Sequence, residues 1–215
     1  MKRDDSTIVQ SVRSRSYGAS FVWKGILFGV LALGVLHVQR TYGRQVEFAS
    51  EEIELTVADS SCSVQGWYWF KNKSPNGAEI VLFYPFVINE RLPYPDTVAV
   101  AEGGTNRAVG FSKTKDGVAF RIGVRAFATA LYRVVYVQRT PENSMEYLLR
   151  TTAQWKKPLE YGLYRVRVPE KFVLTRSTMV FSQIVRQNGE WIYEACEEHF
   201  MPSEDFIIQW QRREP

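Results

Sequence analysis

Polar and apolar residues alternate along most of the chain beyond residue 45, as they do in strands that bury one face. The segment 118–126 shows this most clearly, because Val118, Phe120, Ile122 and Val124 alternate with small or charged residues. Successive side chains of a strand point to opposite sides. The spacing therefore predicts a half-buried strand at 118–126.

Nine further segments show a similar pattern and are joined by short loops rich in turn residues. We predict these strands at 53–57, 63–70, 79–88, 130–138, 146–152, 163–169, 178–185, 191–196 and 205–210. A helical patch at 144–149 is an alternative for one of them. About ten strands with no convincing soluble helix indicate a mainly β fold, an antiparallel β-sandwich, over residues 52–215.

The most apolar part of the chain is the run FVWKGILFGVLALGVLHVQR at 21–40. Its apolar stretch of about 17 residues would form a helix of roughly 26 Å, close to the ~30 Å hydrocarbon core of a bilayer. Trp23 and Lys24 at one end and Arg40 at the other are residue types that anchor such helices at membrane surfaces. We therefore predict a transmembrane helix at 21–38.

Two alternatives explain the same run less well. A cleaved export signal has a short basic start, whereas here about twenty polar residues precede the run. Thr41 and Gly43 offer only a weak cleavage site. A buried helix of a soluble domain would need a large helical surrounding, and the segments that follow are predicted strands.

The distribution of charge orients the predicted anchor. Of the net charge of +4, the first 38 residues hold five basic and two acidic side chains, and the remainder holds 22 and 21. Basic residues before an apolar helix favour the cytoplasmic side. We expect a cytoplasmic tail at 1–20, a linker at 39–51 and a periplasmic or extracellular domain at 52–215. This domain has no basic stripe of the kind that binds nucleic acid, so we expect no nucleic-acid partner.

Cys62 and Cys196 are the only cysteines of the chain. A disulfide between them is chemically permitted in an exported domain, and buried unpaired cysteine is the alternative. No Cys-x-x-Cys motif or Cys/His cluster is present. Zinc-finger, thioredoxin-like and iron–sulfur chemistry are therefore unsupported.

The residues that could carry catalysis are few. His199 is the only histidine after residue 38, and Glu197 would share its strand face. The two are a weak candidate for metal binding, because zinc normally takes three or four ligands. Many Ser-His-Asp hydrolases carry a Gly-x-Ser-x-Gly motif around the nucleophilic serine, and this sequence has no such motif. We expect no enzyme activity, metal or cofactor.

Aromatic residues give the best candidates for a binding surface. The stretch GWYWF places Trp67 and Trp69 on one strand face and Tyr68 and Phe70 on the other. An exposed pair would suit stacking on sugar rings or a protein contact, and burial of both pairs is the alternative. Tyr94 lies between two prolines that favour an extended loop, which makes it a second candidate contact residue.

Two longer patterns resemble known protein groups. IELTVADSSCSVQGWYWFKNKSPNGAEIVLFYPF resembles the start of β-sandwich modules of the vault/inter-alpha-trypsin type. YLLRTTAQWKKPLEYGLYRVRVP and HFMPSEDFIIQW resemble a group of exported bacterial β-sandwich proteins of unknown function. These stretches are spread over residues 53–210 and make up less than half of that range. They are packing and turn patterns, so the resemblance implies a fold and no catalytic residue.

These observations predict a membrane-anchored extracytoplasmic protein that acts through protein–protein contacts as an assembly or accessory subunit. Its expected partners are the lipid bilayer, through residues 21–38, and a membrane or envelope protein. The alternative is a carbohydrate-binding module or hydrolase of the cell envelope that uses Trp67 and Trp69. A flat apolar patch or an unpaired edge strand would favour the protein partner. An aromatic platform beside clustered carboxylates would favour the alternative.

Overall fold

The computed structural model of the chain describes residues 45–214, which form thirteen β-strands and one short 3-10 helix. The predicted tail and membrane helix in residues 1–38 lie outside the described residues, as do the anchor residues Trp23, Lys24 and Arg40. Within the described residues, no helix is long and apolar enough to cross a membrane.

Short connections join most of the strands. Their bounds are β1 Val46–Val57, β2 Ser61–Asn72, β3 Ala78–Pro85, β4 Thr97–Glu102, β5 Phe111–Lys113, β6 Gly117–Val124, β7 Thr129–Arg139, β8 Ser144–Tyr147, β9 Leu159–Pro169, β10 Phe172–Ser177, β11 Gln183–Gln187, β12 Glu190–Phe200 and β13 Phe206–Arg212, with the 3-10 helix η1 at Arg150–Trp155.

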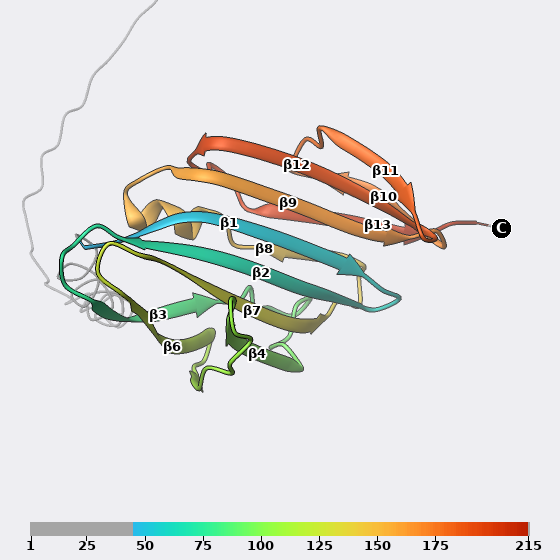
Figure 1. The fold of residues 1–215 in the computed structure, drawn as a ribbon. Helices are drawn as coiled ribbons and strands as arrows, with labels where there is room; N and C mark the ends of the chain where they lie inside the picture. Colours follow the sequence, from blue (N-terminus) through green and yellow to red (C-terminus); the bar gives the residue numbers. More distant parts are fainter. Residues whose placement is uncertain (1–44, 215) are drawn as a thin grey trace, which may run out of the picture. The chain divides into compact units, whose positions relative to one another are not determined.

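Seven strands form one large sheet in the order β11-β12-β9-β1-β2-β7-β4 (Figure 1). All its pairs are antiparallel except β1 and β9, which run parallel with Ser50 opposite Tyr161 and Thr56 opposite Arg167. A parallel neighbour needs a long connection, and here strands β2 to β8 lie between the two in sequence. The prediction of a purely antiparallel sandwich of about ten strands is therefore wrong in this pair and in the strand count, whereas the mainly β class is confirmed.

Two three-stranded sheets, β10-β13-β8 and β3-β6-β5, lie against one face of the large sheet (Figure 1). The hydroxyl of Tyr68 in β2 lies 2.8 Å from that of Tyr84 in β3 and 3.0 Å from that of Tyr147 in β8. From the same face, Tyr164 of β9 packs edge-on against Phe206 of β13. The fold is thus sandwich-like, with one layer divided into two small sheets.

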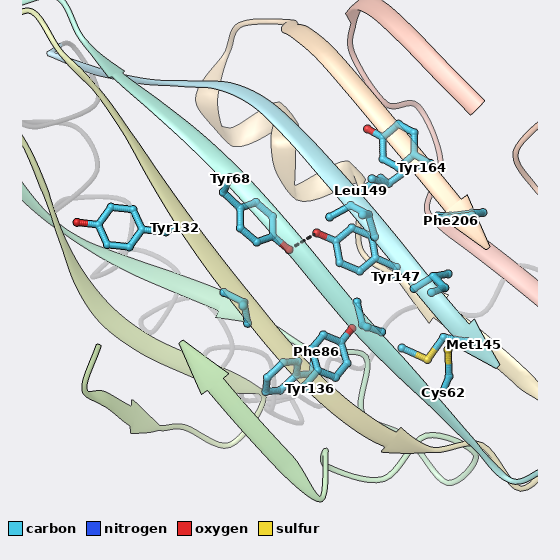
Figure 2. Packing of buried hydrophobic residues seen from close by; sticks show 14 of the residues in the cluster. Cys62, Tyr68, Phe86, Tyr132, Tyr136, Met145, Tyr147, Leu149, Tyr164 and Phe206 are labelled. Carbon is cyan, nitrogen blue, oxygen red and sulfur yellow. Dashed lines mark hydrogen bonds between the residues drawn. The ribbon is translucent and has the colours of Figure 1, made fainter. Parts of the chain in front are cut away.

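A continuous hydrophobic core lies between these layers, and Figure 2 shows part of it. Val118, Phe120, Ile122 and Val124 of β6 are no more than 4% exposed, which confirms the predicted inward face of that strand. Full burial of one such side chain stabilises a fold by about 1.5–3 kcal/mol. Strand alternation therefore accounts for which face of each element carries the core.

Several element bounds differ from the predicted ones. β1 begins at Val46, inside the segment 39–51 that we expected to be a linker, and Val46 is fully buried. Residues Ser144–Tyr147 form strand β8 and no helical patch. The predicted strand at 178–185 is mostly the connection between β10 and β11, and it carries the chain from a small sheet to the large one.

Candidate functional site

The four aromatic rings of β2 are divided between the two faces of the large sheet. Tyr68 and Phe70 are buried in the core, at 6% and 4% exposure. Trp67 and Trp69 alternate with them and are half-buried on the opposite face, which the two small sheets do not cover. Trp67 and Trp69 therefore lie side by side on an outer surface of the domain.

The neighbours of the two tryptophans make this surface mixed in character. Trp67 lies between Glu52 of β1 and Arg133 of β7, and Trp69 has Leu131 of β7 beside it. All of these side chains are half-buried. They form a flat sheet face in which aromatic, aliphatic and charged groups alternate.

The carboxylates next to the tryptophans are engaged by arginines. Arg165 of β9 lies 2.6 Å from Glu194 and 3.8 Å from Glu52, and Arg167 lies 2.9 Å from Glu54. Such partly exposed pairs contribute about 1 kcal/mol or less each. Glu52 and Glu54 are therefore part of an ion-pair network and do not form the free carboxylate pair of a glycosidase.

Strand β11 is one of the two edge strands of the large sheet (Figure 1). All five of its residues are exposed. Among residues 45–214 it pairs only with β12, so one row of its backbone groups has no strand neighbour. Ile184 and Val185 are 54% and 37% exposed, and Val180 just before the strand is 87% exposed. This segment is an exposed sheet edge that carries apolar side chains between polar ones.

Tyr94 is held differently from the prediction. Its hydroxyl donates a hydrogen bond of 2.7 Å to the carbonyl of Gly117, and its ring packs edge-on against Phe86 at 5.5 Å. The ring thus packs partly against the core and remains half-buried. Tyr94 helps to fix the loop before β4, so only part of its side chain is available for a contact.

The two cysteines are free thiols, so the possible disulfide is not formed. Cys62 of β2 is fully buried on the core face, where burial raises the pKa of its thiol. Cys196 of β12 is exposed. Strands β1 and β9 lie between β2, which carries Cys62, and β12, which carries Cys196. At ~4.8 Å per strand, β2 and β12 are roughly 14 Å apart, whereas a disulfide needs Cα atoms within about 7 Å.

Glu197 and His199 differ in backbone conformation and in exposure. His199 has a φ of 50°, in the left-handed region, and is absent from the pairs of β12 with β9, whose register is the same before and after it. Its side chain is exposed, whereas Glu197 is half-buried opposite Gly162. Among residues 45–214, no group of three or more His, Cys, Asp or Glu side chains is placed to hold a metal ion.

A buried carboxyl group was missed by the sequence analysis. Glu51 is 2% exposed on the core face of β1, where the hydroxyl of Tyr164 donates a hydrogen bond of 2.9 Å to it. Burial raises the pKa of Glu51 to about 7, although hydrogen bonds from Tyr164 and Tyr147 oppose the shift. The signal in the sequence was weak, because Glu51 sits among other acidic residues that are exposed or half-buried.

Tyr68 and Tyr164 each follow a glycine that makes room for the tyrosine ring. Gly66 precedes Tyr68 by two residues, and Gly162 precedes Tyr164 in the same way. A Cβ added at Gly66 would lie 1.9 Å from the Tyr68 hydroxyl oxygen, and one at Gly162 would lie 2.7 Å from that of Tyr164. Each glycine therefore leaves the space into which the tyrosine ring folds back along its own strand. Figure 2 shows Tyr68 bonded to Tyr147 within the core.

No family model and no curated protein matches the chain. A "putative nutrient binding protein" from Legionella pneumophila subsp. pneumophila str. Philadelphia 1 has a similar fold, with a TM-score of 0.62 at 16% identity over 77% of this chain and 67% of that one. A mutant M1 zinc metallopeptidase from Deinococcus radiodurans, bound to a Tyr-Ser-Ala substrate, gives a TM-score of 0.50 at 14% identity over 77% and 43%. This chain thus spans less than half of the peptidase. At these identities the likeness is one of fold alone.

Proposed function

We propose that this protein is a membrane-anchored, non-catalytic subunit whose β domain binds a partner protein outside the cytoplasm through the β11 edge. The apolar run at 21–38 and the basic residues before it support the anchor and its orientation. The observation that carries the binding function is the exposure of all five residues of β11, two of them the apolar Ile184 and Val185, at one end of the large sheet.

The chemistry of such an edge suits the addition of a strand from another chain. An extended segment of the partner that pairs with β11 would satisfy its outward row of backbone N–H and C=O groups. Ile184 and Val185 are consecutive, so they project to opposite faces of the sheet and would each contact the added strand. Confinement of both proteins to one membrane would raise the effective concentration of the partner.

A photo-crosslinking amino acid at position 185 tests this proposal in the full-length chain in native membranes. Val81 of the edge strand β3 is a matched control site, because it is a valine with 41% exposure against 37% for Val185. We expect irradiation to join a specific partner protein to position 185 and not to position 81. Val185→Lys should reduce recovery of that partner at least tenfold, because a charge on an edge strand opposes strand addition, whereas Val81→Lys should retain it. Recovery of the protein alone at every detergent strength, or equal products from both sites, would contradict the proposal.

Carbohydrate binding is the second candidate, and the side-by-side position of Trp67 and Trp69 on the outer face favours it. Aromatic rings on a flat surface can stack on sugar rings. Binding of cell-envelope glycan fragments that is lost in both Trp67→Ala and Trp69→Ala, with the β11 variant unaffected, would replace the proposal above with this one.

A further inference from the structure

A cavity of about 560 Å³ lies among β3, β6, β7 and the segment that follows β4. None of these elements contributes to the β11 edge. Its volume falls within the range of roughly 300–1,000 Å³ that is typical of small-molecule sites. A small molecule would therefore fit this cavity.

Arg121 of β6 and Arg125, the residue that follows this strand, both line the cavity. Arg121 and Arg125 are exposed and stand on either side of Gly123, because alternate residues of a strand share a face. Neither takes part in a salt bridge among residues 45–214. A Cβ at Gly123, the residue midway between them, would meet no atom within 4 Å, so the space beside Gly123 is open.

The opposite wall of the cavity is fixed by internal bonds. The Tyr132 hydroxyl accepts a hydrogen bond of 2.9 Å from the Gly123 N–H and donates one of 3.2 Å to the Gly123 carbonyl. Glu102 pairs with Arg107 and also accepts a hydrogen bond of 3.1 Å from the Thr105 hydroxyl. These contacts hold β6 and the segment after β4 in place, so the cavity does not depend on a ligand for its shape.

The charged residues that line the cavity determine which anions it would favour. Three arginines and two glutamates line the cavity, which gives a net formal charge of +1. Glu79 stands opposite Gly123 in the β3–β6 pairing, close to Arg121 and Arg125. This carboxylate opposes groups with two negative charges, such as phosphate. Two arginines with one glutamate nearby therefore favour a single negative charge.

We propose that this cavity binds a small organic monocarboxylate. Arg121 and Arg125 hold its carboxylate, since the planar guanidinium group matches the two carboxylate oxygens. Ala78, Ala108 and Val109 provide apolar lining for its hydrocarbon part. This site is independent of the proposed partner-binding edge, because the two share no residue.

Isothermal titration calorimetry of the full-length chain with butyrate tests the site. We expect saturable binding with one site per chain, and at least tenfold weaker binding of the neutral isostere butyramide. The double variant Arg121→Gln/Arg125→Gln should bind butyrate at least tenfold more weakly. Arg176→Gln is the matched control, because Arg176 is also an exposed strand arginine outside the cavity, and it should bind like the wild type.

A steric variant gives a second measurement that leaves both arginines in place. Gly123→Leu would place a large side chain in the open space beside Gly123, between Arg121 and Arg125 in sequence, and no neighbouring atom obstructs its Cβ. We expect it to fold with the circular dichroism spectrum of the wild type and to lose butyrate binding. Absence of saturable butyrate binding, unchanged binding in both cavity variants, or tighter binding of inorganic phosphate than of butyrate would each overturn the proposal.

Discussion

Glu51 couples the stability of the domain to pH, because its carboxyl group lies in the hydrophobic core. Its pKa is raised by burial from 4.5 to about 7 in the folded protein. Between these two values the unfolded chain loses the Glu51 proton and the folded chain keeps it. Stability therefore falls as the pH rises from about 4.5 to about 7, by roughly 3 kcal/mol in total, and this group adds no slope outside that window.

Glu51→Gln removes this ionisation while it retains a polar side chain of similar size. We expect urea unfolding of the wild type to show the fall in free energy between pH 4.5 and pH 7, and the variant to lose most of that slope. Glu198→Gln, at an exposed position of β12, is the control and should keep the slope. Identical slopes in the wild type and Glu51→Gln would show that Glu51 does not carry the effect.

Gly66 is a position where one methyl group should disturb the core. Its Cβ would lie 1.9 Å from the Tyr68 hydroxyl oxygen, which also bonds to Tyr84 and Tyr147. The ring must move and break these bonds, so we expect Gly66→Ala to lower the free energy of unfolding by about 1–3 kcal/mol. Gly104→Ala, with nothing near its Cβ, should change it by less than about 0.5 kcal/mol. Denaturant unfolding of both variants measures the difference, and equal stabilities would refute the packing argument.

Strands with unbroken alternation were the ones that the sequence identified best. β6 keeps one register throughout, and its inward residues were assigned correctly. In β2 the separation of the two aromatic pairs onto opposite faces was predicted, whereas which pair is buried was left open. β1 was predicted to begin later, because its register shifts between Phe48 and Ser50 and the pattern of period two is interrupted there. In β12, His199 has a φ of 50°, which departs from the extended backbone that simple alternation assumes.

Partner strands and edges are set by contacts distant in sequence, which a local pattern does not contain. Nothing in the segments 53–57 and 163–169 indicates that they pair in parallel. The apolar letters of 178–185 suggested a strand at the place where the chain crosses between sheets, and the exposed β11 edge begins only at Gln183. The candidate site was therefore predicted for Trp67 and Trp69 at the level of the strand face, whereas the β11 edge and the Arg121–Arg125 cavity emerged only from the topology.

Across the domain, the ion pairs, the arginine-lined cavity and the exposed sheet edge lie on different strands. The domain is nearly neutral, and among the described residues its outer sheet face pairs glutamates of β1 with arginines of β9. Unpaired arginines line the cavity beside β6, and the exposed apolar edge belongs to β11. A long-range field of one sign is therefore not what brings a partner to this domain. Confinement at a membrane is the means of raising local concentration that the sequence supports.

The proposed anchor gives a prediction for the full chain. If residues 21–38 span the bilayer, the protein should stay in the membrane pellet after alkaline carbonate extraction, and its intact mass should match all 215 residues. A chain that lacks residues 1–38 should move to the supernatant, because most of the large apolar side chains in residues 45–214 are packed in the core between the sheets. Circular dichroism of that shorter chain checks that its strands still form. A full-length gene product found in the supernatant with a shortened N-terminus would instead establish a cleaved export signal, and partner binding by β11 would then have to proceed without the concentrating effect of the membrane.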